Sequence, residues 1–133
     1  MANLTRYIPR TTAENQGAVP FDTPEQAWFW FVQAQTAREE GAQLREGEAL
    51  VQRPCEPLDI FHALDRLYRN RCLLRDHLLV LRHYGMRLKT PNRNRPKEAR
   101  AASLWREAMA RLEPVLVRKG IVSPALANIQ PAY

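Results

Sequence analysis

Residues 23–41 read TPEQAWFWFVQAQTAREEG, and they contain the strongest helix signal in the chain. Thr23 offers an N-cap hydroxyl, Pro24 fits the first helical position, and Gln26 stands three residues after the cap. This is the pattern of a capping box. Gly41 supplies a left-handed stop. The sequence therefore predicts a helix from Pro24 up to the residue before Gly41.

This helix has an unusual distribution of side chains. Trp28, Phe29, Trp30, Phe31 and Val32 are consecutive, so bulky apolar groups project all round the helix. One face can enter the core, and the others must meet the chain before the helix, another helix or another subunit. We therefore predict a partner interface, in a homodimer or with another protein, at Trp28, Phe29, Trp30 and Phe31. A core role for the whole run is the competing interpretation.

Three further helices follow from apolar residues that recur at three- and four-residue steps. They are expected at Pro57 to Arg69, at Arg71 to Tyr84 with Gly85 as the stop, and at Pro96 to Lys119. Pro114 should kink the last helix or begin a separate turn. Since no segment shows clear two-residue alternation, we predict an all-α fold, a small helical domain of about four main helices.

The chain has 133 residues, which is enough for one domain with an ordinary core. Residues 1–20 lack a sustained period and are predicted to form a flexible arm. Residues 21–120 are predicted to form a single helical domain. Residues 121–133 carry no charge and two prolines, and we expect them to form a tail.

The net charge of +6 is distributed unevenly along the chain. Up to Gln52 there are four Lys/Arg against seven acids, and from Arg53 to Lys119 there are sixteen against seven. The helical domain therefore divides into an aromatic and acidic assembly half, residues 21–52, and a basic half, residues 53–120. The basic residues are mostly arginine, which is favoured at phosphate contacts, so a nucleic-acid partner is expected first.

The segment from Arg87 to Lys97 is the strongest functional candidate. It holds five cations and no acid, and it leads directly into a predicted helix start. Free backbone N–H groups and the positive end of the helix dipole favour anions at such a start, so the segment suits phosphate contacts. The predicted nucleic-acid-binding residues, including arginines of the preceding helix and one neutral donor, are Arg71, Arg75, Arg82, Arg87, Lys89, Arg93, Asn94, Arg95, Lys97 and Arg100.

These features predict a non-enzymatic nucleic-acid-binding protein, a DNA-binding transcriptional regulator or a DNA-associated accessory factor. Duplex DNA is preferred because no aromatic residues interleave with the basic segment to stack unpaired bases. A compact helix-turn-helix is excluded because Pro91 would lie inside its recognition helix. The alternative is a protein-protein interaction or adaptor module that uses Trp28–Val32, with the basic face binding an acidic protein partner.

Other classes of function have little support in the sequence. The three histidines and two cysteines have no metal-binding spacing, so no metal, cofactor or catalytic residue is predicted. His77 lies in an apolar arc and is expected to be a hydrogen-bonded core histidine. Cys55 and Cys72 are expected to be buried. No apolar stretch is long enough for a membrane span and no secretory signal is present, so we expect a cytoplasmic protein without membrane contact.

Overall fold

The computed structural model describes residues 17–41 and 52–124. This part of the chain contains four α-helices, one short 3-10 helix and no strand, so the all-α prediction is confirmed. In chain order the elements are α2 (Pro24–Glu39), α4 (Pro57–Arg69), α5 (Arg75–Arg87), the 3-10 helix η2 (Pro96–Glu98) and α6 (Ala99–Arg118). The predicted arm and tail lie largely outside the described residues, as does most of the chain between α2 and α4.

The helix α2 begins as its sequence predicts. The hydroxyl oxygen of Thr23 accepts a hydrogen bond from the backbone N–H of Gln26 at 3.2 Å. In return, the side-chain oxygen of Gln26 accepts from the N–H of Asp22 at 3.0 Å. The first bond satisfies a backbone donor that a helix start otherwise leaves free. The second reaches the residue before the N-cap, whereas a capping box would bind the N–H of Thr23 itself.

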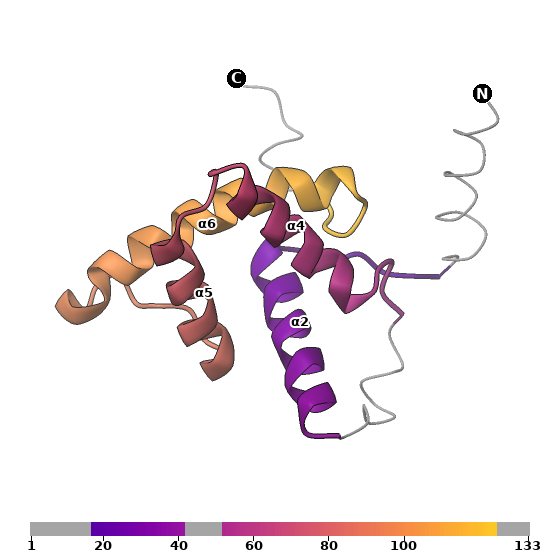
Figure 1. The fold of residues 1–133 in the computed structure, drawn as a ribbon, viewed down its shortest axis with the longest axis horizontal. Coiled ribbons are helices and arrows are strands. Elements are labelled where there is room, and N and C mark those ends of the chain that lie inside the picture. Colours follow the sequence, from indigo (N-terminus) through magenta and orange to yellow (C-terminus); the bar gives the residue numbers. More distant parts are fainter. Residues whose placement is uncertain (1–16, 42–51, 125–133) are drawn as a thin grey trace.

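The four helices enclose one core (Figure 1). The long helix α6 crosses the molecule, α5 and α2 project from it in the same direction, and α4 lies against α2 and α6. Buried apolar side chains from all four helices meet between them. The largest fully buried side chains of the described residues are Phe21, Ile60, Leu73, Leu81, Leu112, Leu116, Ile121, His77 and Val122.

The boundaries of α5 differ from the prediction at its start. Arg71 has a φ of +65°, which excludes it from a right-handed helix. The N–H groups of Cys72 and Leu73 both donate to the carbonyl of Leu67, which turns the chain and buries the Leu73 side chain. The predicted helix start at Arg71 is therefore wrong, because burial of Leu73 requires a turn there and α5 begins only at Arg75.

The predicted stop at Gly85 is also wrong, because this glycine serves packing. Gly85 is buried inside α5, and a Cβ atom there would lie 2.7 Å from Nε1 of Trp28 and 3.1 Å from the Val32 side chain. The same Trp28 nitrogen donates to the carbonyl of Leu81 at 3.0 Å. Close approach of α2 therefore requires the glycine, and α5 continues to Arg87 before Leu88 ends it with a φ of +56°.

The helix α6 continues past Pro114 to Arg118, so the separate final turn considered above does not occur. Beyond it, Ile121 and Val122 are buried and pair with the chain ahead of α2. The N–H of Phe21 donates to the carbonyl of Ile121 at 2.9 Å, and the N–H of Ser123 returns to the carbonyl of Phe21 at 2.8 Å. The packed domain therefore extends beyond Gly120, and the first residues of the predicted tail belong to it.

His77 is a core histidine, as predicted, with 2% of its surface exposed. Its Nδ1 accepts from the N–H of Leu74 at 3.0 Å, so its proton lies on Nε2 and is donated to Glu107 at 2.8 Å. This bond lowers the pKa of Glu107. Cys72, by contrast, is exposed, and the prediction that it is buried is wrong because the turn before α5 directs it outward.

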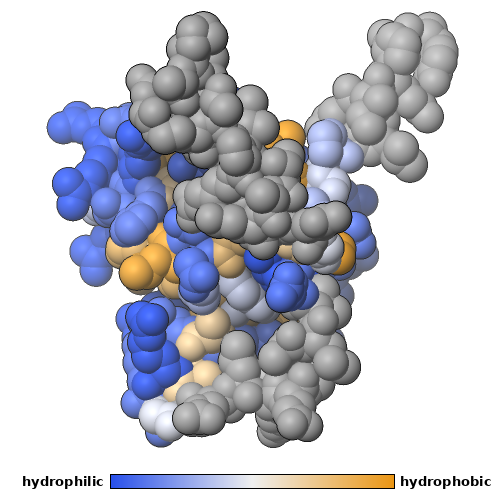
Figure 2. All heavy atoms as spheres, turned by 90° about the vertical axis from the view of Figure 1, so that its right-hand side faces the viewer, coloured by the Kyte–Doolittle hydropathy of each residue, from blue (hydrophilic) through white to orange (hydrophobic). Residues whose placement is uncertain are grey.

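On the face seen in Figure 2, the visible described residues are largely hydrophilic, with apolar patches between the polar regions. None of the described helices is long and apolar enough to cross a membrane.

Candidate nucleic-acid interface

A network of hydrogen bonds centred on Glu98 holds the basic loop between α5 and α6. The N–H of Asn92 donates to the Glu98 carboxylate at 2.9 Å, and Arg95 lies 3.5 Å from its second oxygen. Asn92 also accepts two bonds, from the N–H of Asn94 to its side chain and from the N–H of Arg95 to its carbonyl. The loop lines an open hollow of about 450 Å³.

The carboxylate of Glu98 is held as an anion. Its hydrogen bond from the N–H of Asn92, followed by the nearby charges of Arg95 and Lys89, lowers its pKa. Only 18% of the Glu98 side chain is exposed. Burial and this neighbouring carboxylate raise the pKa of Tyr84. Glu98 thus lies on the inner side of the loop, while the cations of the loop remain outside.

All ten residues predicted to bind nucleic acid are exposed. Between Arg71 and Arg100 there are nine Lys/Arg and two acids, Asp76 and Glu98. Asp76 pairs with Arg100 at 2.9 Å, and Glu98 lies beside Arg95. Among the described residues, no acidic ion-pair partner lies within 4.0 Å of the other seven, which are Arg71, Arg75, Arg82, Arg87, Lys89, Arg93 and Lys97.

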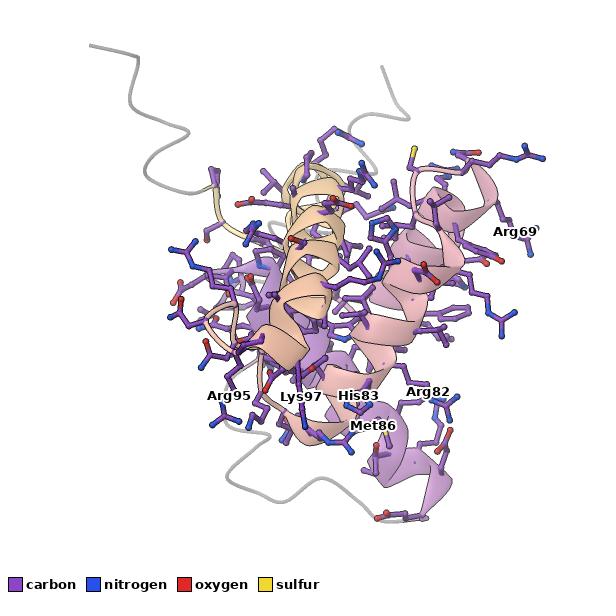
Figure 3. The ribbon with its side chains drawn as sticks, turned by 90° about the vertical axis from the view of Figure 1, so that its left-hand side faces the viewer. Arg69, Arg82, His83, Met86, Arg95 and Lys97 are labelled. Atoms are coloured by element: carbon purple, nitrogen blue, oxygen red, sulfur yellow. The ribbon has the colours of Figure 1, made fainter. Side chains whose placement is uncertain are left out.

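Figure 3 labels three of these residues, Arg82, Arg95 and Lys97, on one side of the molecule. Arg95 and Lys97 project beside the start of α6, and Arg82 and His83 project from α5. Arg75 begins α5 and Arg87 ends it, so the cations extend over the length of this helix, about 20 Å. We call this surface, formed by the ten predicted residues, the basic face.

Two details of the predicted interface change. Arg71 lies in the turn before α5 and does not share a helix face with Arg75 and Arg82, because its backbone is left-handed. The predicted helix start at Pro96 is a single 3-10 turn, and the α-helix begins at Ala99. The sequence predicts that an external anion binds at this helix start. In the structure the protein supplies a negative charge there itself, since the carboxylate of Glu98 accepts a hydrogen bond from the N–H of Asn92.

His83 was missed by the sequence prediction. It is exposed on α5, and Arg87 donates to both its carbonyl and its ring at 3.2 Å. The sequence contained one signal for it: residues four apart lie on the same side of a helix, so His83 could be expected beside Arg87. Leu79 and Met86 are exposed on the same helix, 51% and 56%, so the outer side of α5 combines cationic and apolar side chains.

The aromatic residues proposed for a partner interface are mostly packed. Trp28 and Phe31 are buried, at 5% and 8% exposure, and Phe29 and Trp30 are partly buried against the core. Phe29 stacks on Trp105 with ring centroids 5.6 Å apart. The run therefore contributes chiefly to the core of the described domain.

The described residues contain no group of three or more His, Cys, Asp or Glu side chains placed to hold a metal ion. Burial, followed by the charge of Asp59, raises the pKa of the Cys55 thiol to about 12, so it is protonated at neutral pH.

Comparison with protein-family models, with curated proteins and with solved structures gives no match for this chain.

Proposed function

We propose that this protein is a non-enzymatic nucleic-acid-binding protein that contacts duplex DNA phosphates through its basic face, as a transcriptional regulator or a DNA-associated accessory factor acting in the cytoplasm. The observation that supports this most strongly is the pairing pattern on the basic face. The two acids between Arg71 and Arg100, Asp76 and Glu98, are engaged by bonds within the protein. Seven exposed cations of the face have no acidic partner among the described residues. Such a surface attracts a polyanion.

Arginine is the predominant cation on this face, and its planar guanidinium can form paired hydrogen bonds with phosphate oxygens. If all seven unpaired cations meet phosphates, the logarithm of the binding constant falls with the logarithm of salt concentration with a slope of about −6. This value counts only the seven cations of the basic face that have no acidic partner among the described residues.

The form of the face favours a duplex over a single strand. Cations along α5 cover about 20 Å, which corresponds to roughly six phosphate steps of 3.4 Å along one strand. The loop from Leu88 to Arg95 contains no aromatic residue on which an unpaired base could stack. Positional phosphate contacts of this kind fix a protein on the duplex without reading its sequence.

Fluorescence anisotropy tests the proposal directly. The protein is titrated onto labelled duplex DNA, single-stranded DNA and RNA of the same sequence over a series of salt concentrations. We expect the tightest binding on duplex DNA, with a steep loss of affinity as salt rises. Absence of binding to all three nucleic acids at low salt would overturn the proposal.

The second candidate function, a protein-protein interaction module or adaptor, is supported by a different observation. Most of the large apolar side chains that remain exposed lie on α4 and α5, and Phe61 of α4 stacks on Phe31 of the aromatic run with ring centroids 6.3 Å apart.

A further inference from the structure

The exposed large apolar side chains of the described residues lie, with one exception, on two helices or next to their ends. Apart from Val19, all of them lie on α4, on α5 or within one residue of the ends of α5: Leu58, Phe61, Tyr68, Leu74, Leu79, Met86 and Leu88. Each is 41% to 58% exposed. Single exposed apolar residues are ordinary, whereas a cluster marks a surface that meets a partner.

Three of these residues, Leu58, Phe61 and Met86, border a groove between α4 and α5. Both helices pack on α2, but they make little direct contact with each other. The space between them has a volume of about 430 Å³. Trp28, Phe31, Val32, Leu64 and Leu78 contribute to its lining, and Leu58, Phe61 and Met86 line it with exposed side chains.

The groove follows α2 from Trp28 to Glu39, which corresponds to about 16 Å, or three helical turns. This length accommodates the apolar face of one amphipathic helix with anchors at i, i+4 and i+7. Only four residues of the lining are polar: Gln35, Thr36, Glu39 and Arg82.

The charges around the groove distinguish its two sides. On α5, Arg82 lines it and has no acidic partner among the described residues. Arg75 lies seven residues earlier on that helix, and therefore on the same side of it. Asp65 on α4 is already paired with Arg69 at 2.9 Å, and Glu39 stands at the end of α2. A ligand that carries negative charge on the side facing α5 complements this arrangement.

We propose that this groove, lined by Trp28, Phe31, Leu58, Phe61, Arg82 and Met86, binds an amphipathic helix of a partner protein that presents apolar anchors to α2 and acidic residues to α5. The inference goes beyond nucleic-acid binding, since apolar burial would supply most of the affinity. Arg82 belongs to both surfaces, so a docked acidic helix would also cover one edge of the basic face.

A second copy of the chain fits the groove less well. Within the described residues, its exposed apolar groups are again those of α4 and α5, apart from Val19. A two-fold contact through α5 would therefore bring the arginines at positions 75 and 82 of both copies together, and like charges oppose such an interface.

Selection from a displayed library of helical peptides tests the proposal. The library fixes leucine at i, i+4 and i+7 and varies the flanking positions among Glu, Lys, Gln and Ala. We expect selected peptides to carry Glu rather than Lys beside the anchors, and to bind Phe61→Ser at least about tenfold more weakly. Leu79→Ser, an exposed apolar position outside the groove lining, is the matched control and should bind as the wild type does.

Arg82→Glu provides the second variant, since it leaves the apolar lining intact. Selection on this variant should favour Lys over Glu. Failure to enrich any peptide, enrichment of Lys on the wild type, or equal binding to Phe61→Ser and the wild type in a folded sample would overturn the proposal. Self-association that Phe61→Ser abolishes would identify a second copy as the occupant instead. Duplex binding by Phe61→Ser reports on the proposed function separately, since Phe61 lies outside the basic face, whereas Arg82→Glu should weaken it.

Discussion

The aromatic run of α2 and the basic loop before α6 are the two most distinctive stretches of the sequence, and the fold uses them in opposite ways. Side chains of the run face inward, where Trp28 bonds to the Leu81 carbonyl and Gly85 leaves space for it. The cations of the loop face outward, while Glu98 alone is drawn inside. The large apolar side chains of the run therefore determine how the helices pack, and the cations of the loop remain at the surface, where they can bind a partner.

This contrast predicts that changes near Trp28 affect stability and that changes on the loop affect binding. The largest effect on stability is expected from Gly85→Ala. Its Cβ would meet the indole nitrogen of Trp28 at 2.7 Å, so α2 and α5 would have to separate. We expect a loss of roughly 3 kcal/mol in the free energy of unfolding, measured by urea denaturation.

Gly120→Ala is the control for Gly85→Ala. Gly120 has open space around it but a φ of +78°, so alanine there should cost only about 1 kcal/mol for its backbone conformation. Duplex affinity per folded molecule should remain that of the wild type in both variants. Equal stability of Gly85→Ala and the wild type would show that the close approach of α2 and α5 is not required.

The second prediction concerns acid stability, which the bond between the buried His77 and the half-exposed Glu107 should influence. Folding lowers the pKa of Glu107, so the unfolded chain binds a proton more readily than the folded one. The stabilisation is therefore complete above the ordinary carboxyl pKa and is lost as the pH falls through the lowered value. Glu107→Gln retains an acceptor for His77 but should remove this part of the acid dependence.

Stability measured by urea denaturation over an acid pH series checks this expectation. Glu113→Gln, on the same helix, is the matched control, because Glu113 makes no ion pair or side-chain hydrogen bond among the described residues. The control should preserve the acid dependence of the wild type. Identical profiles for Glu107→Gln and the wild type would contradict the assigned role of Glu107.

Arg71→Gly is expected to raise the free energy of unfolding, by less than Gly85→Ala lowers it. Arg71 holds a left-handed backbone conformation that glycine adopts more readily, so the variant should gain about 1 kcal/mol of stability. It should also lose one cation of the basic face, which predicts weaker duplex binding and a salt slope reduced by about 0.9. A stabilised variant with unchanged binding would remove Arg71 from the interface.

The sequence predicts most of the fold where the signals are local. Thr23 with Pro24 locates the start of α2, and Pro57 locates the start of α4. Prediction from sequence fails where contacts between distant residues decide the structure. The turn at Arg71 depends on burial of Leu73, and the continuation of α5 through Gly85 depends on the close packing of Trp28 against it. Burial of Ile121 likewise depends on pairing with the chain before α2.

For the candidate site, too, the sequence predicts what depends on local signals and fails where distant contacts decide. Exposure of the ten predicted residues could be expected from their charge and polarity. The role of Glu98 could not, because the sequence separates it by six positions from Asn92, and only the closed loop brings the two together. The groove depends on the relative placement of three helices, which no local pattern specifies.

The most direct measurement is the salt slope of duplex binding for Arg93→Gln combined with Lys97→Gln. Both residues are exposed cations without an acidic partner among the described residues, and replacing them leaves the Glu98 bonds in place. Arg118→Gln combined with Lys119→Gln removes the same charge at the far end of α6. We predict that the loop variant reduces the slope by about 1.8, twice the value for one phosphate, and that the control leaves it unchanged. Equal slopes for the two variants would contradict phosphate binding by the basic face.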